Sequence, residues 1–97
     1  MNALARFPQI ALRIIKEQEL IIGPLAWEEA RKVQGIQVFD PKKGEINLQN
    51  GDAGEIIDKL VAQYERLFGK ASHEVCKEAV QDLIAEMPPE EIPSSLK

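Results

Sequence analysis

The residues best suited to chemistry in this chain are its one histidine and its one cysteine, His73 and Cys76. They stand three positions apart near the start of a predicted helix, where a thiolate can have a lowered pKa. A Cys/His nucleophilic pair also needs a substrate cleft and oxyanion donors, and no spacing in the sequence supplies either. We therefore expect Cys76 to be a small core residue and His73 to lie at the edge of its helix face.

Paired carboxylates are a second source of chemistry, and Glu28 and Glu29 are neighbours in the sequence. Adjacent positions on a helix point about 100° apart, so the two side chains do not converge on one atom. We expect them to act as partners of the helix dipole in the first turn.

A third candidate is GEINLQNGDAGE, residues 44 to 55, where Asn47, Asn50, Asp52 and Glu55 are spaced by glycines. Calcium loops place oxygen ligands at alternate positions and end in a bidentate glutamate, and this stretch lacks both. One cysteine and one histidine cannot complete a structural zinc site. The sequence therefore predicts no metal, no cofactor and no catalytic residues, and a protein that is not an enzyme.

Four stretches repeat apolar side chains every three to four residues, which is the period of an amphipathic helix. Asp52 and Ser72 are the expected N-caps of the last two, because their side chains accept hydrogen bonds from free backbone N–H groups. Pro8 fits best near the first turn of the first helix, so the residues before it form an arm or a kinked extension. The expected helices run from Asn2 or Phe7 to Ile22, from Pro24 to about Gln34, from Asp52 to Gly69 and from Ser72 to Pro88.

The first two helices meet at a Gly-Pro corner. Gly23 suits the left-handed residue that ends a helix, and Pro24 supplies the fixed φ of the first position in the next one. We expect Ile21 and Ile22 to turn inward beneath this corner.

Between the second and third helices, in residues 36 to 50, apolar and polar residues alternate around the turn signals of FDPKKGE. This pattern predicts a short two-stranded ribbon. It is equally typical of an extended loop that packs Val38, Phe39, Ile46 and Leu48 onto the helices, because isolated hairpins are marginally stable.

The predicted fold is mainly α, with two packed αα-hairpins, four helices in all, joined by the short β-ribbon or long loop. A chain of 97 residues forms one domain, residues 1–97, with a single core. Residues 88–97 are too rich in proline for a helix, so we expect an extended, partly loose tail that Ile92 and Leu96 can anchor.

Charge and hydropathy indicate which partners and which cellular compartment to expect. The net charge of −4 divides into +1 for residues 1 to 50 and −5 for residues 51 to 97. An acidic half without a basic stripe repels a phosphate backbone, so we expect no nucleic-acid partner. No apolar run is long enough to cross a membrane, and charges interrupt the N-terminal segment where a signal peptide would be apolar. We expect a cytoplasmic protein without a membrane partner.

Two segments carry a resemblance to known families. IIGPLA (Ile21–Ala26) and LVAQYERLFGKAS (Leu60–Ser72) resemble small helical domains of unknown biochemical role from bacteria, particularly cyanobacteria. The Ile-Gly-Pro-Leu-Ala portion is also similar to helical segments appended to some bacterial serine/threonine kinases and signalling proteins. The match covers about a fifth of the chain. It implies no catalytic residues and suggests a free-standing partner module in bacterial signalling.

The absence of converging polar groups beside strong helical patterning favours a non-enzymatic protein–protein interaction or regulatory module. The alternative, from a different class, is a small-molecule sensor with a pocket near Trp27 and Tyr64. The core is the commoner fate of such aromatic side chains.

The candidate partner-binding residues are Leu12, Leu20 and Trp27. Both leucines fall outside the apolar arc of the first helix, among charged residues, and Trp27 lies at the border of its arc near the Gly-Pro corner. Such a contact suits a symmetric homodimer or a helix-in-groove partner. The alternative is two unrelated exposed leucines, which are common on protein surfaces.

Overall fold

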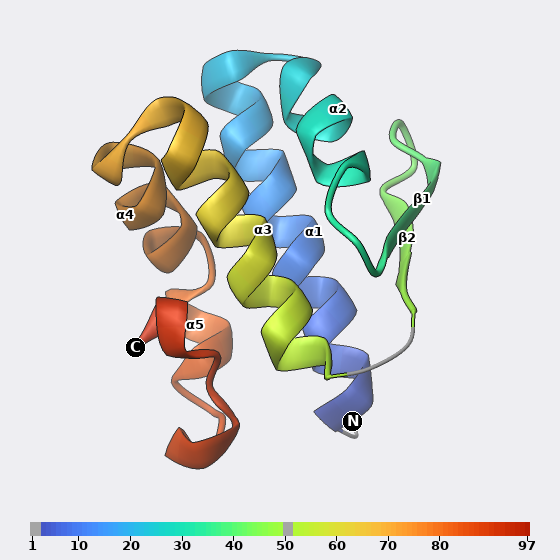
Figure 1. Ribbon diagram of the computed structural model, residues 1–97. Helices are drawn as coiled ribbons and strands as arrows, with labels where there is room; N and C mark the ends of the chain where they lie inside the picture. Colours follow the sequence, from blue (N-terminus) through green and yellow to red (C-terminus); the bar gives the residue numbers. More distant parts are fainter. Residues whose placement is uncertain (1–2, 50–51) are drawn as a thin grey trace.

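The computed structural model describes residues 3–49 and 52–97. This part of the chain is mainly helical and carries one two-stranded antiparallel sheet, as the sequence predicts (Figure 1). Its elements in chain order are α1 (Ala3–Ile22), α2 (Leu25–Arg31), β1 (Ile36–Asp40), β2 (Glu45–Leu48), α3 (Ala53–Phe68), α4 (Lys70–Ala79), α5 (Gln81–Ile84) and the 3₁₀ turns η1 (Pro89–Glu91) and η2 (Ser94–Leu96).

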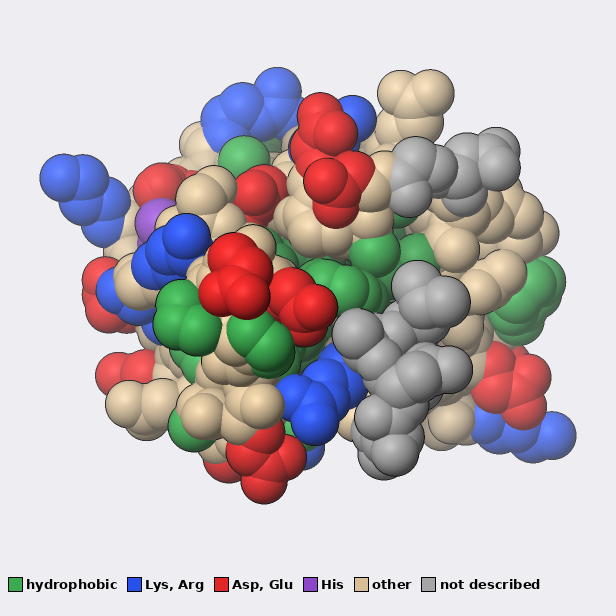
Figure 2. All heavy atoms as spheres, turned by 90° about the horizontal axis from the view of Figure 1, so that it is seen from below, with side chains coloured by type: hydrophobic (Ala, Val, Ile, Leu, Met, Phe, Trp, Pro, Cys, Tyr) green, Lys and Arg blue, Asp and Glu red, His purple; other side chains and the backbone are tan. Residues whose placement is uncertain are grey.

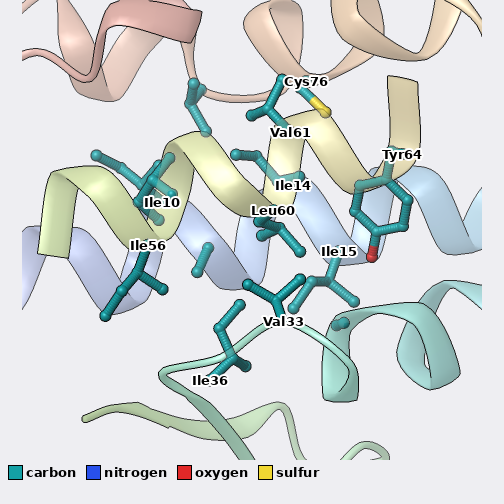
Figure 3. Packing of buried hydrophobic residues seen from close by; sticks show 14 of the residues in the cluster. Ile10, Ile14, Ile15, Val33, Ile36, Ile56, Leu60, Val61, Tyr64 and Cys76 are labelled. Atoms are coloured by element: carbon teal, nitrogen blue, oxygen red, sulfur yellow. The ribbon is translucent and has the colours of Figure 1, made fainter. Parts of the chain in front are cut away.

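The core lies between α1 and α3, which run side by side through the centre of the molecule (Figure 1). Ile14 and Ile15 of α1 face Leu60 and Tyr64 of α3, and all four side chains are fully buried (Figure 3). Helix α1 runs without a break through Pro8, and the Asn2 boundary lies outside the described residues.

The Gly-Pro corner between α1 and α2 forms as predicted. Gly23 has φ 68°, and its N–H donates to the Glu19 carbonyl oxygen at 2.9 Å. The inward orientation of Ile21 is wrong, however, because 62% of this side chain is exposed. Ile21 borders a shallow groove between α1 and α4, where the short side chains of Val75 and Ala79 do not cover it.

Of the two expected forms of residues 36 to 50, ribbon or extended loop, the structure shows the ribbon. Strands β1 and β2 pair antiparallel, with Ile36 opposite Leu48 and Val38 opposite Ile46. The register shifts after Val38, and Phe39 at this irregularity remains 59% exposed. The ribbon packs its other apolar side chains against the helical core, which supplies the support that an isolated hairpin lacks.

The second helical pair differs from the prediction at two points. Ser72 does not cap a helix: α4 begins at Lys70, directly after Gly69, whose φ of 89° lets the chain turn without a linker. Helix α4 also ends early, at Val80, which has φ −118° and a fully buried side chain. The described residues therefore form five helices, and the expected pair of αα-hairpins is not confirmed.

The predicted extended tail contains the two short turns η1 and η2. Leu96 is fully buried against α3 and α4, and Ile92 is half-buried beside the same core. The end of the chain thereby becomes part of the hydrophobic cluster.

Candidate functional site

The side chain of His73, on α4, bonds both to α3 and to the C-terminal tail. Its Nδ1 lies 3.1 Å from a carboxylate oxygen of Glu65 on α3, and its Nε2 donates to the Ser95 carbonyl oxygen in the tail at 2.6 Å. Both partners accept hydrogen bonds, so both ring nitrogens are best satisfied when protonated. The pKa of His73 is raised above its usual value, mainly by the hydrogen bond to the Ser95 carbonyl. Burial opposes this rise, and the Glu65 carboxylate adds to it.

Cys76 is not paired with His73. The thiol is fully buried and accepts a hydrogen bond from Gln18 Nε2 at 3.4 Å, and its sulfur points into the core (Figure 3). Burial raises the pKa of Cys76 to about 11. Because both nitrogens of His73 have other partners, the imidazole has no free base to offer this thiol.

We predict that Cys76 is inert in the folded protein. A pKa of about 11 leaves far less than a hundredth of the thiol ionised at pH 8, and only the thiolate is nucleophilic. Iodoacetamide should therefore alkylate Cys76 at least about 100-fold more slowly than it alkylates a free cysteine, as followed by mass spectrometry. In 6 M urea or another unfolding condition the rate should return to that of the free amino acid. Fast labelling of the folded chain would contradict the burial of this thiol.

Two buried polar side chains escape prediction from the sequence. Gln18 is fully buried, and its Nε2 donates to the Ser72 carbonyl oxygen at 3.0 Å. Its position four residues after Ile14 places it on the apolar face, which is the signal that would have found it. Glu29, expected to be only a dipole partner, is also buried, and its carboxylate accepts from Lys32 at 3.0 Å and Gln63 at 2.7 Å. These bonds lower the pKa of Glu29.

The two large aromatic side chains proposed to border a pocket lie in the core. Trp27 is 4% exposed and donates from Nε1 to Glu19 at 2.9 Å, so it contributes little to the surface. Tyr64 is fully buried, and its hydroxyl donates to the Ala26 carbonyl oxygen at 2.7 Å. Burial is the main cause that raises the Tyr64 pKa well above its ordinary value.

The three candidate partner-binding residues do not share one surface. Leu12 is half-buried, and its methyl groups lie under Gly44 at the turn of the ribbon. The ribbon therefore covers the side of α1 that the sequence left without a partner. Leu20 is 80% exposed and is the only one of the three that is open to a partner.

Leu20 has apolar neighbours that the sequence analysis did not group with it. Ile21 and Leu25 flank it at the α1–α2 corner and are exposed, and Leu67 is exposed in the last turn of α3. The corner and this last turn lie at the same end of the molecule (Figure 1). We call these four side chains the apolar end. The opposite end mixes acidic, basic and hydrophobic side chains (Figure 2).

The part of the chain that the structure describes shows neither a cluster of metal ligands nor a helix that could span a membrane. In residues 3–49 and 52–97, no three His, Cys, Asp or Glu side chains gather closely enough to hold a metal ion. Within the same residues, no helix combines the length and the apolar character needed to span a bilayer. Asn50, part of the calcium-like stretch, lies outside them.

Comparison with known proteins adds no relative. No family model, no curated protein and no solved structure matches this chain. Function must therefore be argued from the surface of the molecule itself.

Proposed function

We propose that this protein is a non-enzymatic protein–protein interaction module that associates with a second copy of itself through the apolar end. The observation that supports the proposal is the exposure of Leu20 and Ile21, at 80% and 62%, on consecutive residues of the longest helix. Large aliphatic side chains exposed at one end of a molecule are typical of contact surfaces. Leu25 of the apolar end lies in the Ile-Gly-Pro-Leu-Ala portion, which resembles helical segments appended to bacterial signalling proteins, and a role in bacterial signalling is part of the proposal.

A second copy suits this surface because an apolar patch is complementary to itself. Two copies related by a twofold axis place the same side chains against each other. The four side chains expose on the order of a few hundred Å² in total, less than the about 800 Å² per partner of a stable interface. The association should accordingly be weak and reversible.

The test is self-association of a charged variant. Leu20→Lys with Ile21→Lys should abolish concentration-dependent association in sedimentation velocity while the circular dichroism spectrum stays unchanged, because both side chains are exposed in the monomer. The matched control is Phe39→Lys, which charges an exposed apolar residue on the ribbon and should associate like the wild type. A wild-type chain that stays monomeric at about 1 mM would exclude the homodimer.

A small-molecule sensor is the second candidate function. One observation favours it, at a place other than the expected pocket near Trp27 and Tyr64. A hollow of about 370 Å³ opens between the base of the ribbon and the start of α3, with Gln49, Glu55 and Lys59 among its polar walls. Trp27 and Tyr64 do not line it. A saturable rise in melting temperature with one compound of a metabolite panel, lost in Lys59→Ala, would support this function.

A further inference from the structure

A groove runs between the end of α2 and the side of α3. Its α3 wall is one stripe of the helix, Lys59, Ala62, Gln63 and Arg66, at the spacing that places side chains on a single face. The opposite wall comes from the residues that end α2 and follow it, Lys32, Val33 and Gln34, and the hollow between the walls measures about 300 Å³.

The groove is basic in a chain whose net charge is negative. Lys32, Lys59 and Arg66 contribute three cations, and among the described residues that line it there is no carboxylate. Glu29 of α2 bonds to its inner edge, and Asp52 and Glu55 line the adjoining hollow, which shares Lys59.

Hydrogen bonds across the groove fix its inner edge. The buried Glu29 carboxylate accepts from Lys32 on one oxygen and from Gln63 on the other, and Gln63 in turn accepts from Arg66 at 3.0 Å. Glu29 thus holds these polar side chains in place, and both of its oxygens are already occupied. Of the three cations only Lys32 pairs with Glu29. Among the described residues Lys59 and Arg66 form no ion pair, so their charges are available to a ligand.

We propose that this groove binds an acidic, extended segment of a protein partner. The cations recognise carboxylates, the side-chain amide of Gln34 can bond to a peptide backbone, and Val33 and Ala62 add a small apolar part to the two walls. The groove and the apolar end have no residue in common, and this contact does not depend on self-association.

The spacing of the cations favours a peptide over a small free acid. Lys59 and Arg66 are seven residues apart on α3, a separation of about 10 Å at 1.5 Å per residue. In an extended peptide, acidic side chains at alternate positions lie on one side and recur about every 7 Å. Two such carboxylates, with flexible stems, reach both cations at once, whereas the two carboxylates of a short diacid are closer together.

Fluorescence anisotropy with a labelled peptide of sequence Gly-Glu-Ala-Glu-Ala-Glu-Gly tests the proposal. The wild-type chain should bind it saturably at low ionic strength, and the matching glutamine peptide should not bind. Lys59→Gln with Arg66→Gln should weaken binding at least about tenfold, because each exposed charge pair contributes modestly and two are lost. The control Lys42→Gln with Lys43→Gln removes equal charge from the exposed ribbon turn and should change the affinity less than about twofold.

A second variant separates binding from folding. Ala62→Glu places a carboxylate in the α3 wall of the groove at an exposed helical position, so it should keep the fold and also weaken binding at least about tenfold. Equal losses of peptide affinity in the groove and ribbon variants would show that diffuse charge attracts the peptide, and the proposed site would be wrong. The proposal would also be wrong if the acidic peptide did not bind at about 1 mM. Competition by succinate at concentrations similar to those of the peptide would assign the groove to small acids instead.

Discussion

Replacing Tyr64 with alanine is expected to lower the free energy of unfolding by about 3–5 kcal/mol. The side chain is fully buried at the point where α3 meets α1 and α2, and its hydroxyl donates to the Ala26 carbonyl oxygen (Figure 3). Truncation leaves both a large cavity and a buried carbonyl without its partner. A domain of this size has about 5–15 kcal/mol in all, so the variant should be close to unfolding at room temperature.

Two further substitutions divide this loss into its parts. Tyr64→Phe keeps the ring and removes only the hydroxyl, so it should cost about 1–3 kcal/mol for the unpaired Ala26 carbonyl. Leu67→Ala, one turn later on the exposed side of α3, should cost less than about 1 kcal/mol. Urea denaturation followed by circular dichroism measures all three. If Tyr64→Ala were no more costly than Leu67→Ala, the tyrosine could not be the centre of the core.

Helices α1 and α3, the corner and the cap of α3 were predictable because their signals are local. Asp52 accepts from Gly54 N–H at 2.9 Å, and Gly23 adopts the left-handed conformation that its place after an apolar run indicates. The fully buried residues of α1 and α3 recur at the helical period, so the core face also follows from the sequence. Each of these features depends on residues within about one helical turn.

The features that were missed depend on contacts between distant segments. Leu12 is outside the apolar arc of α1, and only the position of the ribbon turn decides that it is covered. Gln18 is buried because the first turn of α4 offers it the Ser72 carbonyl. The exposure of Ile21 likewise depends on the side chains that α4 places beside it. Helical period alone cannot predict which of these side chains another element will cover.

The tail is held to the helices by polar contacts on both sides of Ser95. Its backbone N–H donates to Asp58 of α3 at 3.0 Å, and its carbonyl oxygen accepts from His73 of α4. Ser94 adds a hydroxyl bond to the same aspartate at 3.1 Å. This clamp places Leu96 in the core, so loosening it should expose apolar surface.

The clamp should make the stability of the protein depend on pH. Because the folded state raises the pKa of His73 above its unfolded value of 6.5, the stabilisation is complete below about pH 6 and is lost as the pH rises through the folded pKa. His73 and Glu65 are each about one-third exposed, which screens the charge, so we expect a loss of about 1 kcal/mol between pH 5.5 and 8.5.

Urea titrations of the wild type and of His73→Gln across this range measure that loss. Glutamine keeps an N–H donor for the Ser95 carbonyl but cannot be protonated, so its free energy of unfolding should be nearly independent of pH in this window. The carboxylates that face the histidine, Glu65 and Glu74, are present in both proteins, and their effects cancel in the difference except where they act on the imidazolium itself. Cys76 and Tyr64 titrate mainly above this range, because burial raises the pKa of each.

A wild type whose stability rises from pH 5.5 to 8.5 relative to His73→Gln would show that His73 is neutral in the fold. A clamp in which the imidazole bonds to Ser95 and Glu65 together would then be wrong.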